Sequence, residues 1–565
     1  MFLPSYRAAV TYAMCAAVAL CTTPSCRELP QDPTWPSPGQ WNVLNKTVDG
    51  KLVSTVPLAA PCHDPQYNEA ACNSLKASWT FPPVHENSST SVQSAYFQTE
   101  ACSPFTERSK PCELGNYSPY TIVVSSAKDI QAGARFAHKQ NIRLVIKNTG
   151  HDFMGKNVGA GSLGLWTHKL KSVEVISNYS STYYSGPAVR MGAGVVGEDA
   201  LPVVSKAGLR IVSGSCPTVG LVGGFAQGGG HSSLTSTYGM GADQALEWEV
   251  VLANGTLTTA TPRKNQDLYW ALSGGGPGTY GVVVSLTVRA FKDGVVAVGS
   301  LSFSADAKSN DTLWTGVEAW LSNIPALVDG GATAIGILSP TSFSVSPLVL
   351  PDRDEADVRD LIAPVTTKLD SLGLEYSVTV TTFPTFMDFY NIYFIPPEWQ
   401  LIDRVSGGRF VPRLVLQNNT AEFVSVLRDL TETTQAMIAL VGVGSSTEDA
   451  IAPNAVAPQW REANMNVLAQ LQWQYNRPWD FNLAQIDEIN NVIVPKLEAV
   501  TPGAGSYLNE ANFANPTWKE DFYGRNYNKL RKIKKAYDPD DLFYGPTIVG
   551  SDAWNVASDG RLCRA

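Results

Sequence analysis

The chain has 565 residues, which exceeds the size at which a single hydrophobic core stops growing, so we expect at least two domains. A hydrophobic content of 44% with only 16% charged residues excludes long disordered segments. The net charge of −9 argues against a surface that binds nucleic acid. The longest basic run, residues 530–535, is spaced like the outer face of a helix, and we expect it to be solvated.

The N-terminus has the features of a secretory signal peptide. Arg7 precedes an apolar stretch at residues 8–21, and small or polar residues follow at 22–26, where a peptidase could cut. The stretch of 14 residues is shorter than the ~20 that cross a bilayer, and no later stretch is apolar enough to be a second one. We therefore expect a signal peptide at residues 1–25, a secreted extracellular protein and no membrane association.

Asn-X-Ser/Thr sequons and cysteines agree with export. The sequons predict N-glycosylation and lie at Asn45, Asn87, Asn116, Asn178, Asn254, Asn310 and Asn418. Outside the signal peptide the number of cysteines is odd, which raises the question of which thiol is unpaired. Spacing suggests two local bridges and one bridge between the chain ends, Cys62–Cys72, Cys102–Cys112 and Cys26–Cys563. Spacing does not prove this connectivity, but the pairing leaves Cys216 over.

The segment at residues 26–115 is rich in Pro, Ser, Asn and Trp, and we expect short helices and loops that wrap the surface. The character changes at Tyr120. Residues 121–125 are strand-like, residues 127–140 have helical spacing at Ile130, Ala134 and Ala137, and residues 143–147 are strand-like again. The pattern predicts a βαβ unit whose second strand leads into a loop that contains His151.

A second small α/β pattern runs from residue 172 to 291. The expected elements are strands at 172–176, 190–195 and 210–212, a helix at 201–207, a hairpin at 248–257 with Asn254-Gly255 at its turn, and a glycine loop at 274–281 that enters a strand. Glycine loops of this kind let the backbone approach a ligand closely.

After Phe291 the pattern predicts an α+β domain built on an antiparallel sheet. The expected strands are 296–303, 334–337, 342–349, 376–382 and 468–475, and the expected helices are 310–321, 356–370, 420–437 and 480–499. The tail, residues 507–543, is expected to fold back onto the first domain. The predicted division is 26–115, 116–291, 292–504 and 505–565.

Two short stretches carry the functional prediction. Residues 147–152 hold His151, and residues 214–220 hold Cys216 and open a glycine-dense segment that ends at His231. A single His in a turn is usually structural, and a single Cys in a loop is usually buried or half of a disulfide. Here each lies in a loop where backbone amides can approach a phosphate-bearing ligand.

At these residues the chain resembles the berberine-bridge-enzyme-like flavoproteins of the vanillyl-alcohol-oxidase and p-cresol-methylhydroxylase superfamily. The resemblance rests on Asn148-Thr-Gly-His-Asp, Cys216-Pro-Thr-Val-Gly, the glycine segment after it, the glycine loop at 274–281 and the tail at 522–543. It covers about 115–291 and 505–545. It implies an α+β fold with a two-subdomain PCMH-type FAD-binding part and a substrate domain whose antiparallel sheet is flanked by helices.

The resemblance also implies FAD held by two covalent bonds, from His151 to the flavin 8α-methyl group and from Cys216 to flavin C6. Many relatives have a second Gly and a Ser around the His, whereas this chain has Thr149 and Asp152. The further residues expected to contact FAD are Lys147, Asn148, Thr149, Gly150, Asp152, Gly214, Pro217, Thr218, Val219, Gly220, Gly223, Gly224, Gly228, Gly229, Gly281, Val282, Asn509 and Asn526. Tyr527 is a weaker candidate of the same kind. No metal is expected.

The catalytic candidates are Tyr507 and Glu510, because the resemblance brings this part of the tail to the flavin and the reaction needs a base. The alternative is that the two residues merely pair at a domain seam. We expect Trp460, Arg461, Gln472 and Trp473 on a substrate-facing strand, where aromatic residues are equally often plain core. The family resemblance also makes the small Val219 a sign that dioxygen can reach the flavin.

These observations favour a secreted, monomeric FAD-linked oxidase that oxidises a CH–OH or CH–NH group of a small molecule or sugar and passes electrons to dioxygen. One alternative keeps the flavin in a dehydrogenase or cyclase that does not use dioxygen. Another alternative is a secreted binding protein without flavin, which the presence of both attachment residues disfavours.

Overall fold

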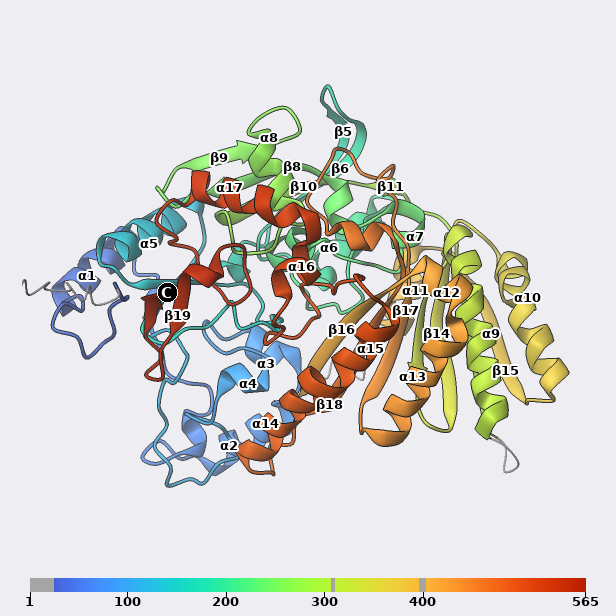
Figure 1. Ribbon diagram of the computed structural model, residues 1–565. Helices are drawn as coiled ribbons and strands as arrows, with labels where there is room; N and C mark the ends of the chain where they lie inside the picture. The colour runs from blue at the N-terminus through green and yellow to red at the C-terminus, as the bar shows by residue number, and fades with distance from the viewer. Residues whose placement is uncertain (1–24, 306–309, 396–402) are drawn as a thin grey trace, which may run out of the picture.

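The computed structural model describes residues 25–305, 310–395 and 403–565. Apart from Ser25, the predicted signal peptide lies outside these residues. Within the described ranges, no helix has the length and apolar character needed to cross a membrane. Figure 1 shows a large sheet covered by helices on one side of the molecule and smaller sheets on the other, with the C-terminal tail returning to the smaller sheets.

The segment after the signal peptide consists of short elements, as predicted. They are α1 (Pro38–Thr47), β1 (Leu52–Ser54), α2 (Glu69–Ser78), α3 (Pro82–Glu86) and α4 (Ala95–Gln98). The segment is more than a surface wrap, because β1 pairs with β2 and the amide of Gln93 donates to the carbonyl of Gly150 at 3.1 Å. Two disulfides, Cys62–Cys72 and Cys102–Cys112, lie within it and confirm the predicted local bridges.

The first sheet has the order β1-β2-β4-β3 and contains the predicted βαβ unit. Its further elements are β2 (Tyr120–Val123), α5 (Ala127–Lys139), β3 (Arg143–Lys147) and β4 (Ser162–Trp166). Both β2 and β3 run parallel to β4, which lies between them. Ser126 is the N-cap of α5, and the Asp129 carboxylate accepts hydrogen bonds from the backbone amides of Ser125 and Ser126. The helix buries Ile130, Ala134 and Ala137, as predicted. The end of β3 therefore presents the loop that contains His151.

The second sheet is antiparallel, with the order β5-β6-β10-β8-β9. Its strands are β5 (Val173–Ser180), β6 (Ser185–Gly192), β8 (Ala245–Val251), β9 (Leu257–Ala260) and β10 (Val282–Arg289). Helices α6 (Gly197–Lys206), α7 (Thr235–Tyr238) and α8 (Gln266–Leu272) connect them, and β7 (Leu209–Arg210) pairs with β11 (Phe291–Lys292). The predicted hairpin is confirmed because β8 and β9 pair around Asn254 and Gly255.

The third sheet has seven antiparallel strands in the order β15-β12-β14-β13-β17-β18-β16. They are β12 (Val296–Ser304), β13 (Thr333–Leu338), β14 (Ser342–Pro351), β15 (Tyr376–Phe383), β16 (Arg404–Pro412), β17 (Met437–Gly442) and β18 (Ala463–Gln472). The helices are α9 (Asn310–Asp329), α10 (Glu355–Leu372), α11 (Phe386–Tyr393), α12 (Arg413–Asn418), α13 (Thr420–Thr433), α14 (Trp479–Glu488) and α15 (Val494–Val500). Figure 1 shows α9, α10 and α13 along one face of the sheet, where Trp320, Leu369 and Leu427 enter one apolar core. The predicted antiparallel α+β domain is confirmed.

Several predicted boundaries in this domain were wrong. The helix predicted to reach Met437 ends at Thr433, because Met437 opens β17, which pairs with β13 and β18 inside the sheet. The last predicted strand, 468–475, instead begins at Ala463 and ends at Gln472. The helix predicted at 480–499 is interrupted by a π-helical turn at Ile489–Ile493. Strands β16 and β17 were missed.

The tail returns to the first sheets, as predicted. It contains α16 (Trp518–Tyr523), α17 (Tyr527–Tyr537), β19 (Trp554–Val556) and β20 (Leu562–Arg564), and Phe543 forms a parallel bridge with Leu144. The basic run is not wholly solvated. Lys534 is buried, and its ammonium donates to Asp538 and to the carbonyls of Thr279 and Phe543. This lysine ties α17 to the glycine loop before β10, which was not predicted.

Candidate active site

A cavity of about 570 Å³ lies between the loops of the two smaller sheets and one face of the seven-stranded sheet. Its volume falls in the range of small-molecule and cofactor sites. Segments of the smaller sheets and the tail line it, among them 148–153, 214–216, 219–220, 223–225, 277–278 and 543–545. The opposite wall comes from β13, β17 and β18 of the large sheet. The cavity is therefore shared by the two regions of the molecule that were predicted to bind cofactor and substrate.

His151 and Cys216 meet at the wall of this cavity. The Cys216 Sγ atom lies 3.9 Å from His151 Nε2, and a hydrogen bond of 2.7 Å joins that nitrogen to Thr218 Oγ1. Cys216 is the free cysteine of the described chain, since Cys26–Cys563 is the third disulfide. The predicted cysteine pairing is thereby confirmed.

Burial controls the protonation of both side chains. It lowers the pKa of His151 to about 3, and the neighbouring Lys147 acts in the same direction. It raises the pKa of the Cys216 thiol. At neutral pH the imidazole is therefore uncharged and has a free electron pair, while the thiol keeps its proton.

The loops around this pair fit a planar cofactor with a phosphate chain. No atom lies within 4 Å of the place where a Cβ of Gly224 would stand, and Gly224 lines the cavity, so any side chain there would occupy cavity space. Gly150 and Gly278 line the cavity with φ of 98° and 68°, a conformation that favours glycine. Asn148 Oδ1 is buried without a hydrogen-bond partner in the described part of the chain, which leaves an acceptor beside the cavity. These features fit the expected FAD.

The structure separates the predicted FAD-contacting residues into two groups. The residues on the cavity wall are Asn148, Thr149, Gly150, His151, Asp152, Gly214, Cys216, Val219, Gly220, Gly223, Gly224 and Asn509. The residues that do not line it are Lys147, Pro217, Thr218, Gly228, Gly229, Gly281, Val282 and Asn526.

The second group supports the wall or lies away from it. A Cβ on Gly228 would stand 2.2 Å from the Asn509 side chain, so this glycine lets Asn509 reach the cavity. Gly281 packs against Val250 at the start of β10, and the Asn526 amide donates to the carbonyls of Ala455 and Val456.

Lys147 lies beneath the His151 loop instead of contacting the cavity. Its ammonium donates to the carbonyls of Ser88 and His85 at 2.7 and 3.2 Å. Burial lowers the pKa of Lys147 to about 7. Nearby, Glu86 Oε1 lies 3.5 Å from His168 Nε2, and both side chains are buried. Burial raises the pKa of Glu86 to about 7 and lowers that of His168 to about 3, so near neutral pH the imidazole is uncharged and the carboxyl is partly protonated.

The two catalytic candidates lie at one end of the cavity but do not pair with each other. One Glu510 oxygen lies 2.9 Å from His231 Nε2, and the other accepts a hydrogen bond of 2.9 Å from Asn466 Nδ2. The Tyr507 hydroxyl accepts hydrogen bonds from the Gly230 amide and from Asn509 Nδ2 at 3.2 and 2.7 Å. Because both of these contacts use the oxygen as acceptor, the hydroxyl proton of Tyr507 is available to another partner.

The titration of this cluster distinguishes its members. Burial raises the pKa of Tyr507 well above its ordinary value, and the Glu510 charge acts in the same direction. Burial lowers and Glu510 raises the pKa of His231, and the net shift is upward. Tyr507 therefore remains a neutral hydrogen-bond donor, while His231 and Glu510 form a pair that can share a proton.

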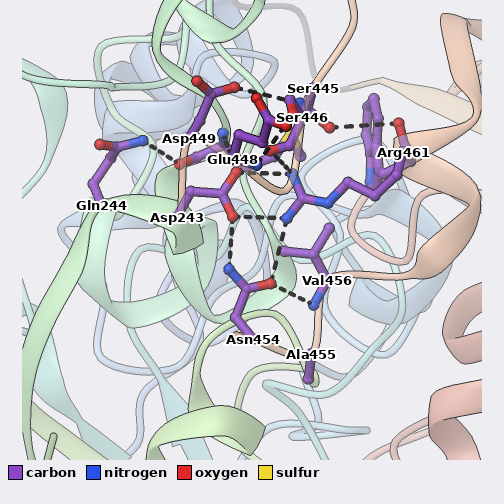
Figure 2. Close-up of polar contacts among 12 residues, drawn as sticks. Asp243, Gln244, Ser445, Ser446, Glu448, Asp449, Asn454, Ala455, Val456 and Arg461 are labelled. Atoms are coloured by element: carbon purple, nitrogen blue, oxygen red, sulfur yellow. Dashed lines mark hydrogen bonds and ion pairs between the residues drawn. The ribbon is translucent and has the colours of Figure 1, made fainter. Parts of the chain in front are cut away.

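Trp460 and Arg461 do not lie on the predicted substrate-facing strand. They belong to a 3-10 turn, Pro458–Arg461, before β18, and Arg461 points to the seam between the two regions of the molecule. Its guanidinium donates to both oxygens of the fully buried Asp243 at 2.7 and 2.9 Å, and Asn454 donates to the same carboxylate (Figure 2). This network connects the loop after β17 to the turn before β8. Gln472 ends β18, Trp473 follows it, and neither lines the cavity.

Several cavity residues were not predicted. His231 was placed only at the end of the glycine segment, and Arg404 was not predicted. Asn466, which contacts Glu510 without lining the cavity, was also missed. The signal that could have found part of the large-sheet wall is the alternation of polar and apolar residues along β18, whereas β17 has no polar side chain. Inward residues of both strands line the cavity. They are Met437, Ala439, Val441, Leu468 and Gln470.

Comparison with known proteins agrees with this geometry. Residues 119–261 match the FAD binding domain family, and residues 506–547 match the family described as berberine and berberine like. The chain is 41% identical over 548 residues to the FAD-linked oxidoreductase ZEB1 of Gibberella zeae, which covers 96% of this chain and 95% of that protein. It is 41% identical over 556 residues to the bifunctional decalin synthase calF of Penicillium decumbens, which covers 96% of each.

Solved structures show the same fold. The crystal structure of the VAO-type flavoprotein MtVAO615 from Myceliophthora thermophila C1 matches with a TM-score of 0.93 at 40% identity, covering 96% of this chain and 100% of that one. A glucooligosaccharide oxidase from Acremonium strictum with a 6-S-cysteinyl, 8α-N1-histidyl FAD has the same fold at 18% identity, with a TM-score of 0.65 over 78% of this chain and 93% of that one. The chain therefore belongs to the berberine-bridge-enzyme-like family of VAO-type flavoproteins and is an FAD-linked oxidoreductase.

Proposed function

We propose that the protein is a secreted, monomeric oxidase whose FAD is bonded to both His151 and Cys216, and which oxidises a CH–OH or CH–NH group of a small molecule or sugar while dioxygen becomes hydrogen peroxide. The observation that carries this proposal is the distance of 3.9 Å between Cys216 Sγ and His151 Nε2 at the cavity wall. The flavin positions C6 and 8α lie close together on one edge of the ring, so two side chains this close can serve one flavin. The distantly related glucooligosaccharide oxidase supports the double linkage.

The remaining residues of the first group would hold the cofactor. Asn148, Gly150, Gly214, Gly220 and Gly224 would contact it through backbone amides and open space. When bound, FAD supplies an acceptor for the hydride that leaves the substrate carbon, and two ring substituents raise its tendency to accept it. The supporting residues Gly228, Gly281 and Asn526 would act through packing instead of contact.

Glu510 is the proposed base. Its carboxylate lies on the cavity and is oriented by Asn466 and His231, so it can take the proton of the substrate hydroxyl or amine. Tyr507 stays protonated and would donate its free hydrogen bond to the substrate oxygen. His231 would then share the proton that Glu510 receives. The two catalytic residues thus have different roles.

Val219 supports the use of dioxygen. It lines the cavity three residues after Cys216, and valine leaves more space there than leucine would. Rapid reoxidation of the reduced enzyme in air is therefore expected. Replacing Val219 by Leu should slow that reoxidation, while the rate at which substrate reduces the enzyme stays the same.

Export is supported by three sets of features. The N-terminal sequence has the pattern of a signal peptide, and three disulfides join six cysteines of the described chain. Among the sequons, Asn87, Asn178, Asn254 and Asn418 have exposed side chains. Secretion into culture medium and a loss of mass after glycosidase treatment would test this part of the proposal.

A dehydrogenase or cyclase that does not use dioxygen is the second candidate. It is favoured by the identity of 41% to a bifunctional decalin synthase. Hydrogen peroxide formed in proportion to the substrate consumed supports the oxidase, whereas turnover that needs another electron acceptor, or none, supports the alternative.

The first experiment is an absorption spectrum of the purified protein before and after acid precipitation. Yellow colour that stays with the pellet is the expected result. Colour in the supernatant would remove the covalent linkage and leave FAD bound only by contacts. A colourless protein would contradict the assignment of the cavity to FAD.

A further inference from the structure

The wall of the cavity formed by the seven-stranded sheet is apolar along most of its length. Alternate residues of three adjacent strands face the cavity, as the period of two in a strand requires. Those of β13 and β17 are aliphatic or thioether side chains: Ile335, Ile337, Met437, Ala439 and Val441. Leu468 of β18 continues the same surface. A sugar, with a hydroxyl on nearly every carbon, would leave its polar groups unpaired against this wall.

The polar groups of this wall lie at its two ends. At one end Glu510 lines the cavity and accepts a hydrogen bond from Asn466 of β18, which lies behind the lining, and the proposed function places proton removal here. At the other end are Gln470 of the same strand and Arg404 of β16. Asn466 and Gln470 are four residues apart, so the two ends are separated by roughly 13 Å along the strand, at about 3.3 Å per residue.

Among the residues that the structure describes, no carboxylate lies within 4.0 Å of the Arg404 guanidinium. Its Nη1 atom lies 2.9 Å from Met437 Sδ, and a thioether sulfur is a weak acceptor. The adjacent Gln470 uses its amide nitrogen to donate to Ser406 Oγ at 3.0 Å. Arg404 is half-buried on a largely apolar cavity, and the planar fork of its guanidinium matches a carboxylate.

We propose that the substrate is an elongated, largely apolar small molecule with a carboxylate that Arg404 binds and an oxidisable CH–OH or CH–NH carbon at the Glu510 end. This inference rests on the proposed function, because it uses the Glu510 end as the site of chemistry. The apolar body of the molecule lies against β13 and β17. Gln470 stands beside the guanidinium at the same end of the wall.

The test uses two hydroxymethyl acids of different length and their primary carboxamides. The acids are 4-(hydroxymethyl)benzoate and 4′-(hydroxymethyl)biphenyl-4-carboxylate. Dissociation constants are measured by calorimetry under argon with holoenzyme whose flavin has first been reduced by dithionite, so that the flavin cannot accept hydride and no turnover occurs. The longer acid is expected to bind about 10- to 100-fold more tightly than its amide, the range for a hydrogen-bonded charge pair. The shorter acid should show less preference because it cannot reach both ends.

Variants of Arg404 test whether this residue causes the preference for the acid over the amide. Arg404→Met should abolish the difference between acid and amide while the flavin spectrum stays unchanged, and Arg404→Lys should keep part of it. Arg413→Met is the matched control, because Arg413 forms an exposed ion pair with Asp329 on α9. The inference is overturned if wild-type enzyme binds acid and amide equally, if it binds neither, or if Arg404→Met keeps the preference. Flavin content and peroxide yield are measured separately, so a failure of the proposed function is recognised independently.

Discussion

The Sγ atom of Cys216 lies 3.9 Å from the Nε2 atom of His151, although 65 positions separate the two residues in the chain. Two segments of the backbone and one side chain produce this proximity. The end of β3 presents His151, the loop after β7 presents Cys216, and Thr218 contacts both side chains.

Removing one attachment residue at a time should reveal both bonds. Cys216→Ala and His151→Ala are each expected to retain acid-stable yellow colour through the remaining bond, with an altered absorption maximum. The double variant should release its flavin into the supernatant after acid precipitation, because only contacts hold it. Mass spectrometry of the flavin-bearing peptide identifies the residue in each case. A single variant that releases all of its flavin shows that the wild type has one bond.

Replacing Glu510 by Gln should slow the reduction of the enzyme by substrate by about 10²- to 10⁴-fold, the contribution of a positioned base. The change keeps the size of the side chain and its contact with Asn466. Anaerobic stopped-flow absorbance at the flavin maximum measures the rate. Unchanged reduction would assign the proton transfer to another group.

His231→Asn should have a smaller effect than Glu510→Gln and should also shift the pH profile of substrate reduction. The reason is that His231 contacts the base and its own pKa is raised by that contact. His138→Asn is the matched control, since His138 forms an exposed pair with Asp540. A lower rate with an unchanged pH profile would indicate a purely structural role.

Breaking the ion pair in Figure 2 should destabilise the protein strongly. Arg461→Leu leaves the fully buried Asp243 without its cation, and removing one partner of a buried pair costs roughly 3–5 kcal/mol. Arg413→Leu breaks the exposed pair with Asp329 and should cost at most about 1 kcal/mol. Denaturant unfolding followed by tryptophan fluorescence compares the two variants. Equal effects would contradict the structural importance of the seam.

Glu86 should make the stability of the protein depend on pH. Burial raises its pKa from 4.5 to about 7, so between these values the folded protein binds a proton that the unfolded chain does not. The contribution of Glu86 to the free energy of unfolding therefore falls as the pH rises from about 4.5 to 7, whereas the lowered pKa values of His85, His151 and His168 act in the opposite direction. Glu86→Gln should remove this part of the dependence, whereas Glu448→Gln, at an exposed position, should leave it unchanged. Thermal melting across this range measures both.

Much of the site was predictable because its signals are local. A strand pattern that ends in a glycine turn predicted the loop that contains His151. The glycine-dense segment predicted that Cys216 also lies in a loop that a ligand can approach. The disulfides followed from short spacing and from elimination, and they are confirmed. Alternation and helical spacing gave most of the elements of the large sheet domain.

The parts that were missed depend on tertiary packing. The strand β16 contains Gly407 and Gly408 and ends at Pro412, features that weaken any strand pattern. The strand β17 is a short apolar run directly after a helix, which periodicity alone cannot assign. The contact of His231 with Glu510 joins residues that are 279 positions apart, and nothing in either local sequence indicates it.

The disulfide between Cys26 and Cys563 has a consequence for the integrity of the cavity. This bond closes the backbone from Cys26 to Cys563 into a covalent ring. Phe543, Tyr544 and Gly545, which close one side of the cavity, lie on that ring near its junction. A single cut of the backbone between Cys26 and Cys563 therefore leaves both fragments attached, so a nicked protein can keep its active site assembled.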